Sequence, residues 1–271
     1  MKDRGSIVLV LLLLELSVQL PLCAQDDSTS LTSIIRSDAG TVWKNTGAYF
    51  TAPLHFSAGE WIAVGTAIAG TALVSRLDQS ARAFQHDRHS QTADEIAGMG
   101  RAYGHTPVAV ALSGGLYLGG LVSGNGNIRS TGLMVFEAIA LGGITTTVLK
   151  SVAGRSRPFL EEGAYAFHGP QSANEMLSFP SGHSTVAFAV SSVLAGRVKN
   201  TYATIAFYSL AAITALSRVY NDEHWLSDNV FGAAIGAVSG LAVVRMHEGS
   251  SGNTSFHFIP LPGGVRVELR F

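Results

Sequence analysis

The residues best suited to chemistry lie between Ser217 and Asp228, where a histidine and an aspartate are four positions apart. At the start of a helix, this spacing lets Asp228 accept a hydrogen bond from one nitrogen of His224, which leaves the other nitrogen nucleophilic. Arg218 adds a guanidinium group that can bind oxygen atoms. A His-x-x-x-Asp pair is also typical of metal sites, but no second pair in the sequence completes a ligand set. The stretch therefore predicts an oriented histidine beside an anion-binding arginine.

A second histidine follows a helix-start signal in the sequence Phe-Pro-Ser-Gly-His at 179–183. Ser181 can cap the helix, Gly182 allows close approach of the backbone, and the free N–H groups of the first turn point toward a bound anion. His183 stands at this helix start, where an imidazole can transfer a proton at neutral pH. A plain serine cap followed by a histidine without a catalytic role explains the same residues, so both interpretations stay open from this segment alone.

A third cluster, Lys-Ser-Val-Ala-Gly-Arg-Ser-Arg-Pro at 150–158, combines basic residues with a glycine and a proline. On a helix, Lys150, Gly154 and Arg157 lie on one face at positions i, i+4 and i+7. Pro158 then ends the helix. Two cations beside a glycine form a cradle for a multiply charged oxyanion. Basic residues near a helix C-terminus also interact favourably with the helix dipole without any ligand.

Six apolar segments rich in Ala, Gly, Ser and Thr must position these clusters. They predict an all-α fold, a six-helix bundle in which small residues at helical spacing, such as Gly232, Gly236 and Gly240, let helices approach closely. In an up-down bundle, the ends of the third and fifth segments and the starts of the fourth and sixth lie together. This arrangement gathers three cations and two histidines in a site suited to in-line displacement at phosphorus. The segments are 58–75, 106–122, 130–149, 184–198, 201–219 and 228–246.

Taken in order, Lys-x6-Arg-Pro, Pro-Ser-Gly-His and Ser-Arg-x5-His-x3-Asp resemble the signature of the type-2 phosphatidic acid phosphatase and vanadium haloperoxidase superfamily. The resemblance covers about residues 55–246 and implies a bundle of the acid phosphatase and haloperoxidase type. It implies that His224 is the nucleophile that forms a phosphohistidine and that Asp228 orients it. It further implies that His183 protonates the leaving oxygen and then activates water. The residues implied to hold the phosphoryl oxygens are Lys150, Arg157, Ser181, Gly182 and Arg218.

This resemblance implies a phosphatase that needs no divalent metal and no cofactor. Because the site is expected at the edge of apolar helices, we expect the substrate to be a phosphate monoester or diphosphate of a lipid, such as phosphatidate or an isoprenyl diphosphate. Specificity is expected in the segment between Pro158 and Pro180. Three alternatives stay open, namely a non-specific periplasmic acid phosphatase for small phosphate esters, a vanadate-dependent haloperoxidase, and a non-catalytic anion-binding membrane bundle.

The composition excludes other classes of protein. The 271 residues carry a net charge of −1, which excludes a nucleic-acid binder that works by bulk positive charge. Hydrophobic residues make up 47% of the chain, which is too many for a disordered protein. In the polar stretch 76–105, His86 and His89 are three positions apart, a spacing that could bind metal. Without an acidic or cysteine partner at a convincing distance, a solvated helix face is the better interpretation.

Residues 1–24 resemble a signal peptide, with Lys2 and Arg4 before an apolar run and a processing site after Ala24. An uncleaved anchor is the alternative, although the run is shorter than the ~20 residues of a membrane span. Cleavage would remove Cys23, the single cysteine, so that the mature protein would have no disulfide. We expect an exported polar arm at 25–56, the bundle at 57–248, and a tail at 249–271 with a β-hairpin around the Pro-Gly-Gly sequence at 262–264.

The expected location is the cell envelope, with the protein associated with or integral to the membrane and its site facing the periplasm. Several apolar segments approach spanning length, yet Glu60 and Glu137 fall inside two of them. The sequence therefore leaves open the number of spans and the side that the site faces. It also leaves open the oligomeric state.

Overall fold

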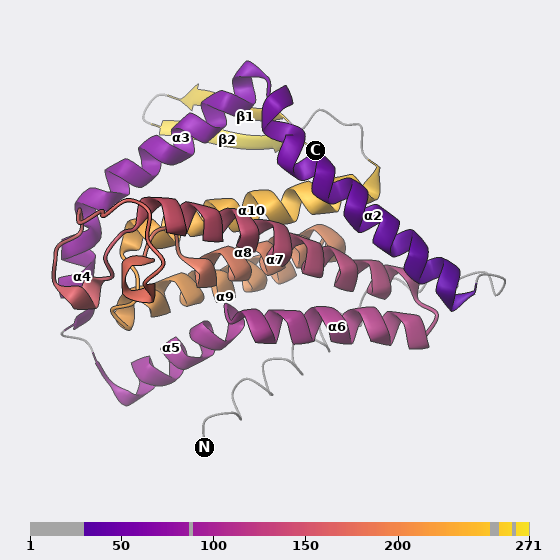
Figure 1. Ribbon diagram of the computed structural model, residues 1–271, viewed down its shortest axis with the longest axis horizontal. Coiled ribbons are helices and arrows are strands. Elements are labelled where there is room, and N and C mark those ends of the chain that lie inside the picture. Colours follow the sequence, from indigo (N-terminus) through magenta and orange to yellow (C-terminus); the bar gives the residue numbers. More distant parts are fainter. Residues whose placement is uncertain (1–29, 87–88, 250–254, 262–263, 271) are drawn as a thin grey trace.

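The computed structural model describes residues 30–86, 89–249, 255–261 and 264–270. Its centre is α8 (Gly182–Val198), which packs against α7 (Gly126–Ala153), α9 (Thr201–Tyr220) and α10 (Leu226–Glu248). Outside this centre, α6 (Thr106–Val122) lies along α7, and α5 (Gln91–Tyr103) packs against α9 (Figure 1). The bundle is therefore built around one buried helix whose first residues belong to the Pro-Ser-Gly-His motif.

Residues 31–86 form an arch over α10 (Figure 1). It consists of α2 (Leu31–Thr51), α3 (Ala58–Val74) and α4 (Asp78–His86), joined by the 3-10 turns Ala52–His55 and Ser75–Leu77. At the other end of the chain, strands β1 (Ser255–Leu261) and β2 (Gly264–Arg270) pair antiparallel beside α3. The predicted signal peptide at 1–24 and the first two residues of the Pro-Gly-Gly turn lie outside the described residues.

Each of the six predicted apolar segments is a helix, which confirms the mostly helical fold, but the count of six is wrong. Within the described residues, three further helices occur, namely α2, α4 and α5. Most of the predicted polar arm at 25–56 is the helix α2. Ser30 caps this helix by accepting from Ser33 N, and polar side chains fasten it to the bundle. The three bonds are Asn45 Nδ2 to Glu137 Oε2 at 3.1 Å, Tyr49 OH with Ser239 Oγ at 2.7 Å, and Tyr117 OH to Asp38 at 2.8 Å.

Small residues bring α10 unusually close to α8. A Cβ atom at Gly232 would overlap the carbonyl oxygen of Ser181, and one at Gly236 would overlap the carbonyl oxygen of Thr185. Because the two backbones touch, the start of α10 is held directly beside the start of α8, and Ser181 N donates to Asp228 O at 2.9 Å. This contact places the third sequence motif next to the second.

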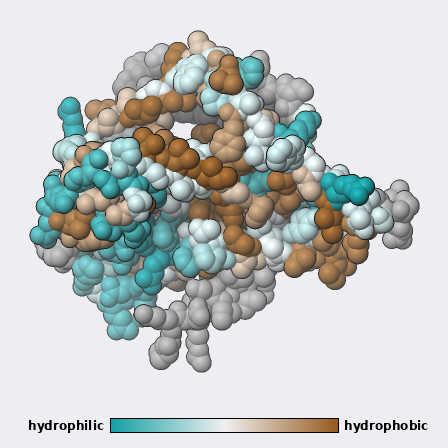
Figure 2. Space-filling model, in the orientation of Figure 1, coloured by the Kyte–Doolittle hydropathy of each residue, from teal (hydrophilic) through white to brown (hydrophobic). Residues whose placement is uncertain are grey.

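The outer surface of the helices is suited to lipid. Among the residues that the structure describes, four helical stretches are long and apolar enough to cross a membrane, or five if the pair α5 and α6, bent by 55°, is one span. Apolar side chains such as Leu118, Val148 and Val238 are exposed, and Figure 2 shows hydrophobic patches along the helices with hydrophilic surface gathered at the end that holds α4 and α5. Exposed Glu60 caps the start of α3, and buried Glu137 bonds His247, so each carboxylate has a hydrogen-bond partner within the chain. The chain is a membrane protein.

The glycine contact between α8 and α10 gives a stability prediction. Gly236→Ala should lower the free energy of unfolding by about 1–3 kcal/mol, because the added methyl group overpacks the α8 backbone. As a matched control, Gly143→Ala on α7 adds a methyl group with nothing within 4 Å and should be neutral or stabilise by about 0.5–1 kcal/mol. Thermal unfolding in detergent micelles measures both variants. Equal midpoints for the two variants would contradict the close packing.

Candidate active site

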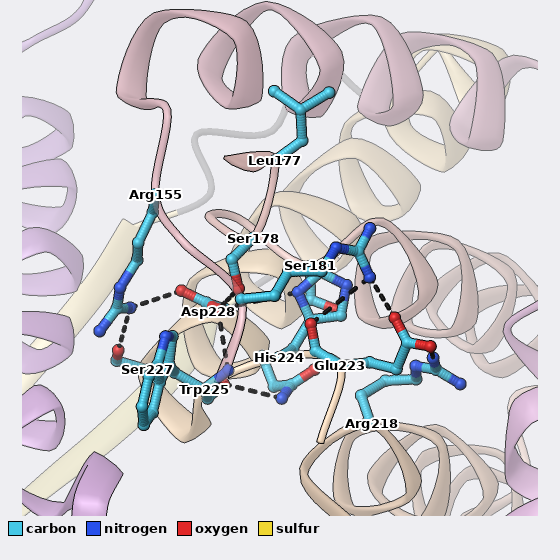
Figure 3. Close-up of polar contacts among 12 residues, drawn as sticks. Arg155, Leu177, Ser178, Ser181, Arg218, Glu223, His224, Trp225, Ser227 and Asp228 are labelled. Carbon is cyan, nitrogen blue, oxygen red and sulfur yellow. Dashed lines mark hydrogen bonds and ion pairs between the residues drawn. The ribbon is translucent and has the colours of Figure 1, made fainter. Parts of the chain in front are cut away.

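The three sequence clusters meet at one end of the bundle (Figure 3). Lys150 comes from the last turn of α7, Ser181 and His183 from the start of α8, and Arg218 from the end of α9. His224 lies in the connection to α10, whose first turn carries Asp228. The structure thus brings together all eight residues that the sequence singled out.

Asp228 is fully buried and saturated with hydrogen bonds. Its Oδ2 accepts from Trp225 N at 2.9 Å and from Ser178 Oγ at 2.5 Å, and its Oδ1 accepts from Arg155 Nη1 at 2.5 Å. His224 Nδ1 lies 3.7 Å from Oδ2, beyond hydrogen-bond distance, and has no hydrogen-bond partner within the described residues. The carboxylate therefore lies beside the imidazole, but the hydrogen bond that the sequence predicts between them is not formed. The bonds of Asp228 fix it to the surrounding scaffold instead.

Both histidines are uncharged at neutral pH. Burial and the nearby Lys150 charge together lower the pKa of His224 to about 3, against the opposing effect of Asp228. Burial and the Arg218 charge likewise lower the pKa of His183 to about 3. A neutral imidazole has a free nitrogen lone pair, so His224 has the protonation state that a nucleophile needs.

The cations surround the two histidines, but they differ in whether their N–H donors already have hydrogen-bond acceptors. Lys150 Nζ donates to the carbonyl oxygens of Leu177 at 2.5 Å and Ser178 at 3.4 Å. Arg218 is buried, and its Nε and Nη1 have no hydrogen-bond partner in the described part of the chain. These orphaned donors beside a helix N-terminus are the feature that a bound oxyanion would satisfy.

Arg157 does not lie on the helix face that the sequence predicts. Helix α7 ends at Ala153, because Gly154 adopts the left-handed conformation (φ 58°) in which its N–H bonds Lys150 O. Position 154 also leaves no room for a side chain, since a Cβ atom there would overlap the carbonyl oxygen of Gly169. Arg157 therefore reaches the site from the loop, where its Nε and Nη2 donate to Asn174 O and Oδ1 at 2.9 and 3.0 Å.

Ser181 and Gly182 begin α8 as predicted. Ser181 Oγ accepts from Ser184 N at 3.4 Å, so this serine is the helix cap. The Lys150 side chain passes over Gly182, with its Cε 3.8 Å from the position that a Cβ would take. Because Gly182 has no side chain, no atom lies between the first turn of α8 and the Lys150 side chain at this point.

Sequence analysis missed the residues that hold Asp228 in place. Arg155 is 2% exposed and bridges two carboxylates, because its Nη2 also donates to Asp78 Oδ2 at 2.7 Å. Asp78 in turn accepts from Ser227 N at 2.8 Å and Ser227 Oγ at 2.7 Å. Arg155 had a signal, since it lies inside the basic cluster, whereas Asp78 had none because it comes from α4, far away in the sequence.

A third histidine also lies near the site. His105, at the break between α5 and α6, stacks on His183 with ring centroids 6.1 Å apart. The tight packing of Gly104 against the His183 backbone fixes this position. In contrast, His89 packs on Tyr220 and lies 3.6 Å from Asp94. Within the described residues, no three His, Cys, Asp or Glu side chains gather as a metal site would require.

The buried charge network gives a second prediction. Asp78→Asn should lower the free energy of unfolding by about 2–3 kcal/mol, because Arg155 loses a charged acceptor where water cannot replace it. Asp222→Asn removes a comparable ion pair with Arg82, but at a partly exposed position, and should cost less than about 1 kcal/mol. Chemical or thermal unfolding compares them, and an equal cost would contradict the structural role of the network.

The neutral histidines predict acid destabilisation. Because both folded-state pKa values lie near 3, the unfolded chain binds more protons below pH 6.5, and the stabilising contribution is lost as pH falls toward 3. Between pH 7 and pH 5 this amounts to about 2 kcal/mol for each histidine. The double variant His183→Gln/His224→Gln should therefore show a flatter dependence of the unfolding midpoint on pH. Parallel curves for the variant and the unaltered chain would show that these imidazoles titrate normally.

Comparisons with known proteins agree with the geometry. The family model of the PAP2 superfamily matches residues 131–251, a range that contains all three motifs. Lipid A 1-phosphatase of Rhizobium johnstonii is 32% identical over 111 residues, which cover 39% of this chain and 43% of that protein. Lipid A 1-phosphatase of Porphyromonas gingivalis is 38% identical over 65 residues, which cover 23% of this chain and 15% of that protein. The chain thus spans less than half the length of these curated relatives.

A solved structure shares the fold. The PAP2 type phosphatidylglycerolphosphate phosphatase from Bacillus subtilis superimposes with a TM-score of 0.54 at 18% identity, over 69% of this chain and 96% of that chain. Residues 131–251 are thus similar to the PAP2 superfamily, and the helices share the fold of this phosphatase.

Proposed function

We propose that the chain is a metal-independent phosphatase that hydrolyses phosphate monoesters or diphosphates of lipids through a phosphohistidine. The observation that carries this proposal is the meeting of two neutral histidines with Lys150, Arg157 and Arg218 at one end of the bundle, within the residues that are similar to the PAP2 superfamily. A site of this composition can stabilise the oxygens of a phosphoryl group and supply both a nucleophile and an acid.

In the first step, His224 attacks phosphorus. Its Nδ1 faces Asp228, so the lone pair on Nε2 forms the P–N bond while the bond from phosphorus to the leaving oxygen breaks. His183 gives the leaving oxygen a proton. In the second step, His183 takes a proton from water, the water oxygen attacks phosphorus, and the P–N bond breaks to release inorganic phosphate and neutral His224.

The negative charge of the substrate favours the protonated form of His183. In the free site, burial and Arg218 keep the pKa of this histidine low. A phosphate group brings negative charge within a few ångströms, which raises the pKa of a neighbouring imidazole. We infer that the proton enters His183 together with the substrate, so the acid is formed only where it is needed.

The oxyanion would be held by donors that are otherwise unused. Arg218 Nε and Nη1 are buried without a partner, and the first N–H groups of α8 after Ser181 point out of the helix start. Lys150 and Arg157 add positive charge on the other side. These donors match the negative charge that the equatorial oxygens of phosphorus carry during displacement.

A phosphorylated lipid is the substrate class that the surroundings favour. The helices that carry the site expose apolar side chains along their length, and the connecting loop exposes Phe159, Tyr165 and Phe167. The curated relatives reported above bear the name of a lipid A phosphatase, which supports a lipid headgroup as substrate. We further propose that the site faces the periplasm. Three basic residues at the opposite end of the bundle support a cytoplasmic location for that end, namely Arg129, Arg197 and Lys199. Arg76 and Arg101 lie at the site end and are evidence against a periplasmic site.

Trapping of the phosphoenzyme tests the proposal. With ³²P-labelled phosphatidate in EDTA, rapid quenching should yield an acid-labile label on His224. His224→Ala should abolish the label and lower turnover by about 10⁴-fold or more, because no other side chain replaces the nucleophile. His183→Ala should slow both labelling and its release. The matched control is His55→Ala, which changes an exposed histidine in the 3-10 turn between α2 and α3 and should keep full turnover. A label on Ser181, or turnover that depends on added metal, would refute this mechanism.

A further inference from the structure

Glu223, which directly precedes the proposed nucleophile, places a carboxylate between two of the phosphate-binding cations. Its Oε2 is paired with Arg157 Nη1, and its Oε1 lies 3.7 Å from Arg218 Nη2. Figure 3 shows the carboxylate directed toward Arg218 and away from the imidazole of His224. The side chain is 36% exposed, so it is in contact with solvent as well as with the site.

The donors of Arg157 are already in use in this arrangement. Nε and Nη2 donate to Asn174, and Nη1 donates to the Glu223 carboxylate and lies 3.5 Å from the Glu223 carbonyl oxygen. The Asn174 carbonyl belongs to the backbone of a 3-10 turn and cannot leave alone. The partly exposed Glu223 side chain is thus the acceptor that can move away from Arg157.

A phosphate group and this carboxylate cannot share the space between the arginines without strong repulsion. Both are anions, and the attraction of Arg157 and Arg218 for either one decreases when the other is present. The structure without phosphate therefore has an internal anion where part of the phosphate would bind.

We propose that Glu223 is a resident anion of the phosphate site, which a phosphate oxygen must replace on Arg157 before catalysis. This inference rests on the proposed function, because it concerns the affinity of the same site for phosphate. The carboxylate keeps the arginines in position while the site is empty. After hydrolysis, its return toward Arg157 assists the release of inorganic phosphate. Glu223 thereby lowers the affinity of the site for substrate and product.

A purely structural role for Glu223 makes the opposite prediction. If the carboxylate only positioned Arg157, its removal would leave the guanidinium misplaced and would weaken phosphate binding. The direction of the change in affinity therefore separates the two roles, and a binding measurement shows it without dependence on turnover.

The test is calorimetric titration of the full chain in detergent with inorganic phosphate. Glu223→Gln should bind phosphate about two- to fivefold more tightly than the unaltered chain, the effect of removing one partly exposed competing ion pair. Asp222→Asn is the matched control, since it removes the same charge one residue away, where the carboxylate is bonded to Arg82 at 2.7 Å. This control should change affinity less than twofold. The Asn side chain also tolerates the left-handed backbone at that position (φ 57°).

Three results would overturn the inference. Unchanged or weaker binding by Glu223→Gln would refute the resident anion and leave the proposed phosphatase intact. Equal tightening in Asp222→Asn would show a general charge effect instead of competition for Arg157. Failure of all three proteins to bind phosphate would refute both the inference and the proposed phosphate site.

Discussion

The buried pair of Arg155 and Asp228 is the interaction on which the geometry of the site depends. Arg155 carries one positive charge between two buried carboxylates, Asp228 and Asp78, and Ser227 and Ser178 satisfy the remaining oxygens. Such a network is stable only when every member is bonded, because an unpaired charge at this depth costs several kcal/mol. Since Trp225 N also donates to Asp228, the backbone next to His224 is fixed by the same network. The position of the imidazole thus depends on a hydrogen-bonded network of charged groups that extends to α4.

Two kinds of charge environment lie side by side as a result. Around Asp228 the charges are paired and dry, which makes this part rigid. Around His183 and His224 the cations exceed the anions. Burial together with these positive charges depresses the pKa of both imidazoles, and donors of Arg218 are left without partners in the described residues. A rigid, fully bonded network next to a pocket with excess positive charge is a preorganised site for an anion, because little reorganisation is needed when the ligand enters.

The sequence predicted the meeting of the motifs because connectivity alone places helix ends together in an antiparallel bundle. Glycines at 232 and 236 predicted close packing and prove to bring α10 against α8. The position of Arg157 was not predictable from helical periodicity, since the left-handed Gly154 ends α7 before it. The role of Asp78 was also not predictable from the sequence. A single carboxylate in a polar stretch carries no periodic signal, and its partner Arg155 lies on a different element. Helix α2 was missed because its polar residues are paired with the bundle, which composition cannot show.

The fastening of α2 has a consequence for the architecture of the chain as a whole. Asn45 and His247 both bond the Glu137 carboxylate, which lies midway along a helix that is apolar enough to cross a bilayer. Lipid chains offer no replacement for these bonds. The part of the protein that precedes the residues similar to the PAP2 superfamily therefore completes the solvation of a charge among those residues. A shortened chain that began at α7 would keep the eight site residues that the sequence singled out, but it would lose Asp78 and the bond from Asn45 to Glu137. The boundary drawn by family likeness is therefore not a boundary for folding.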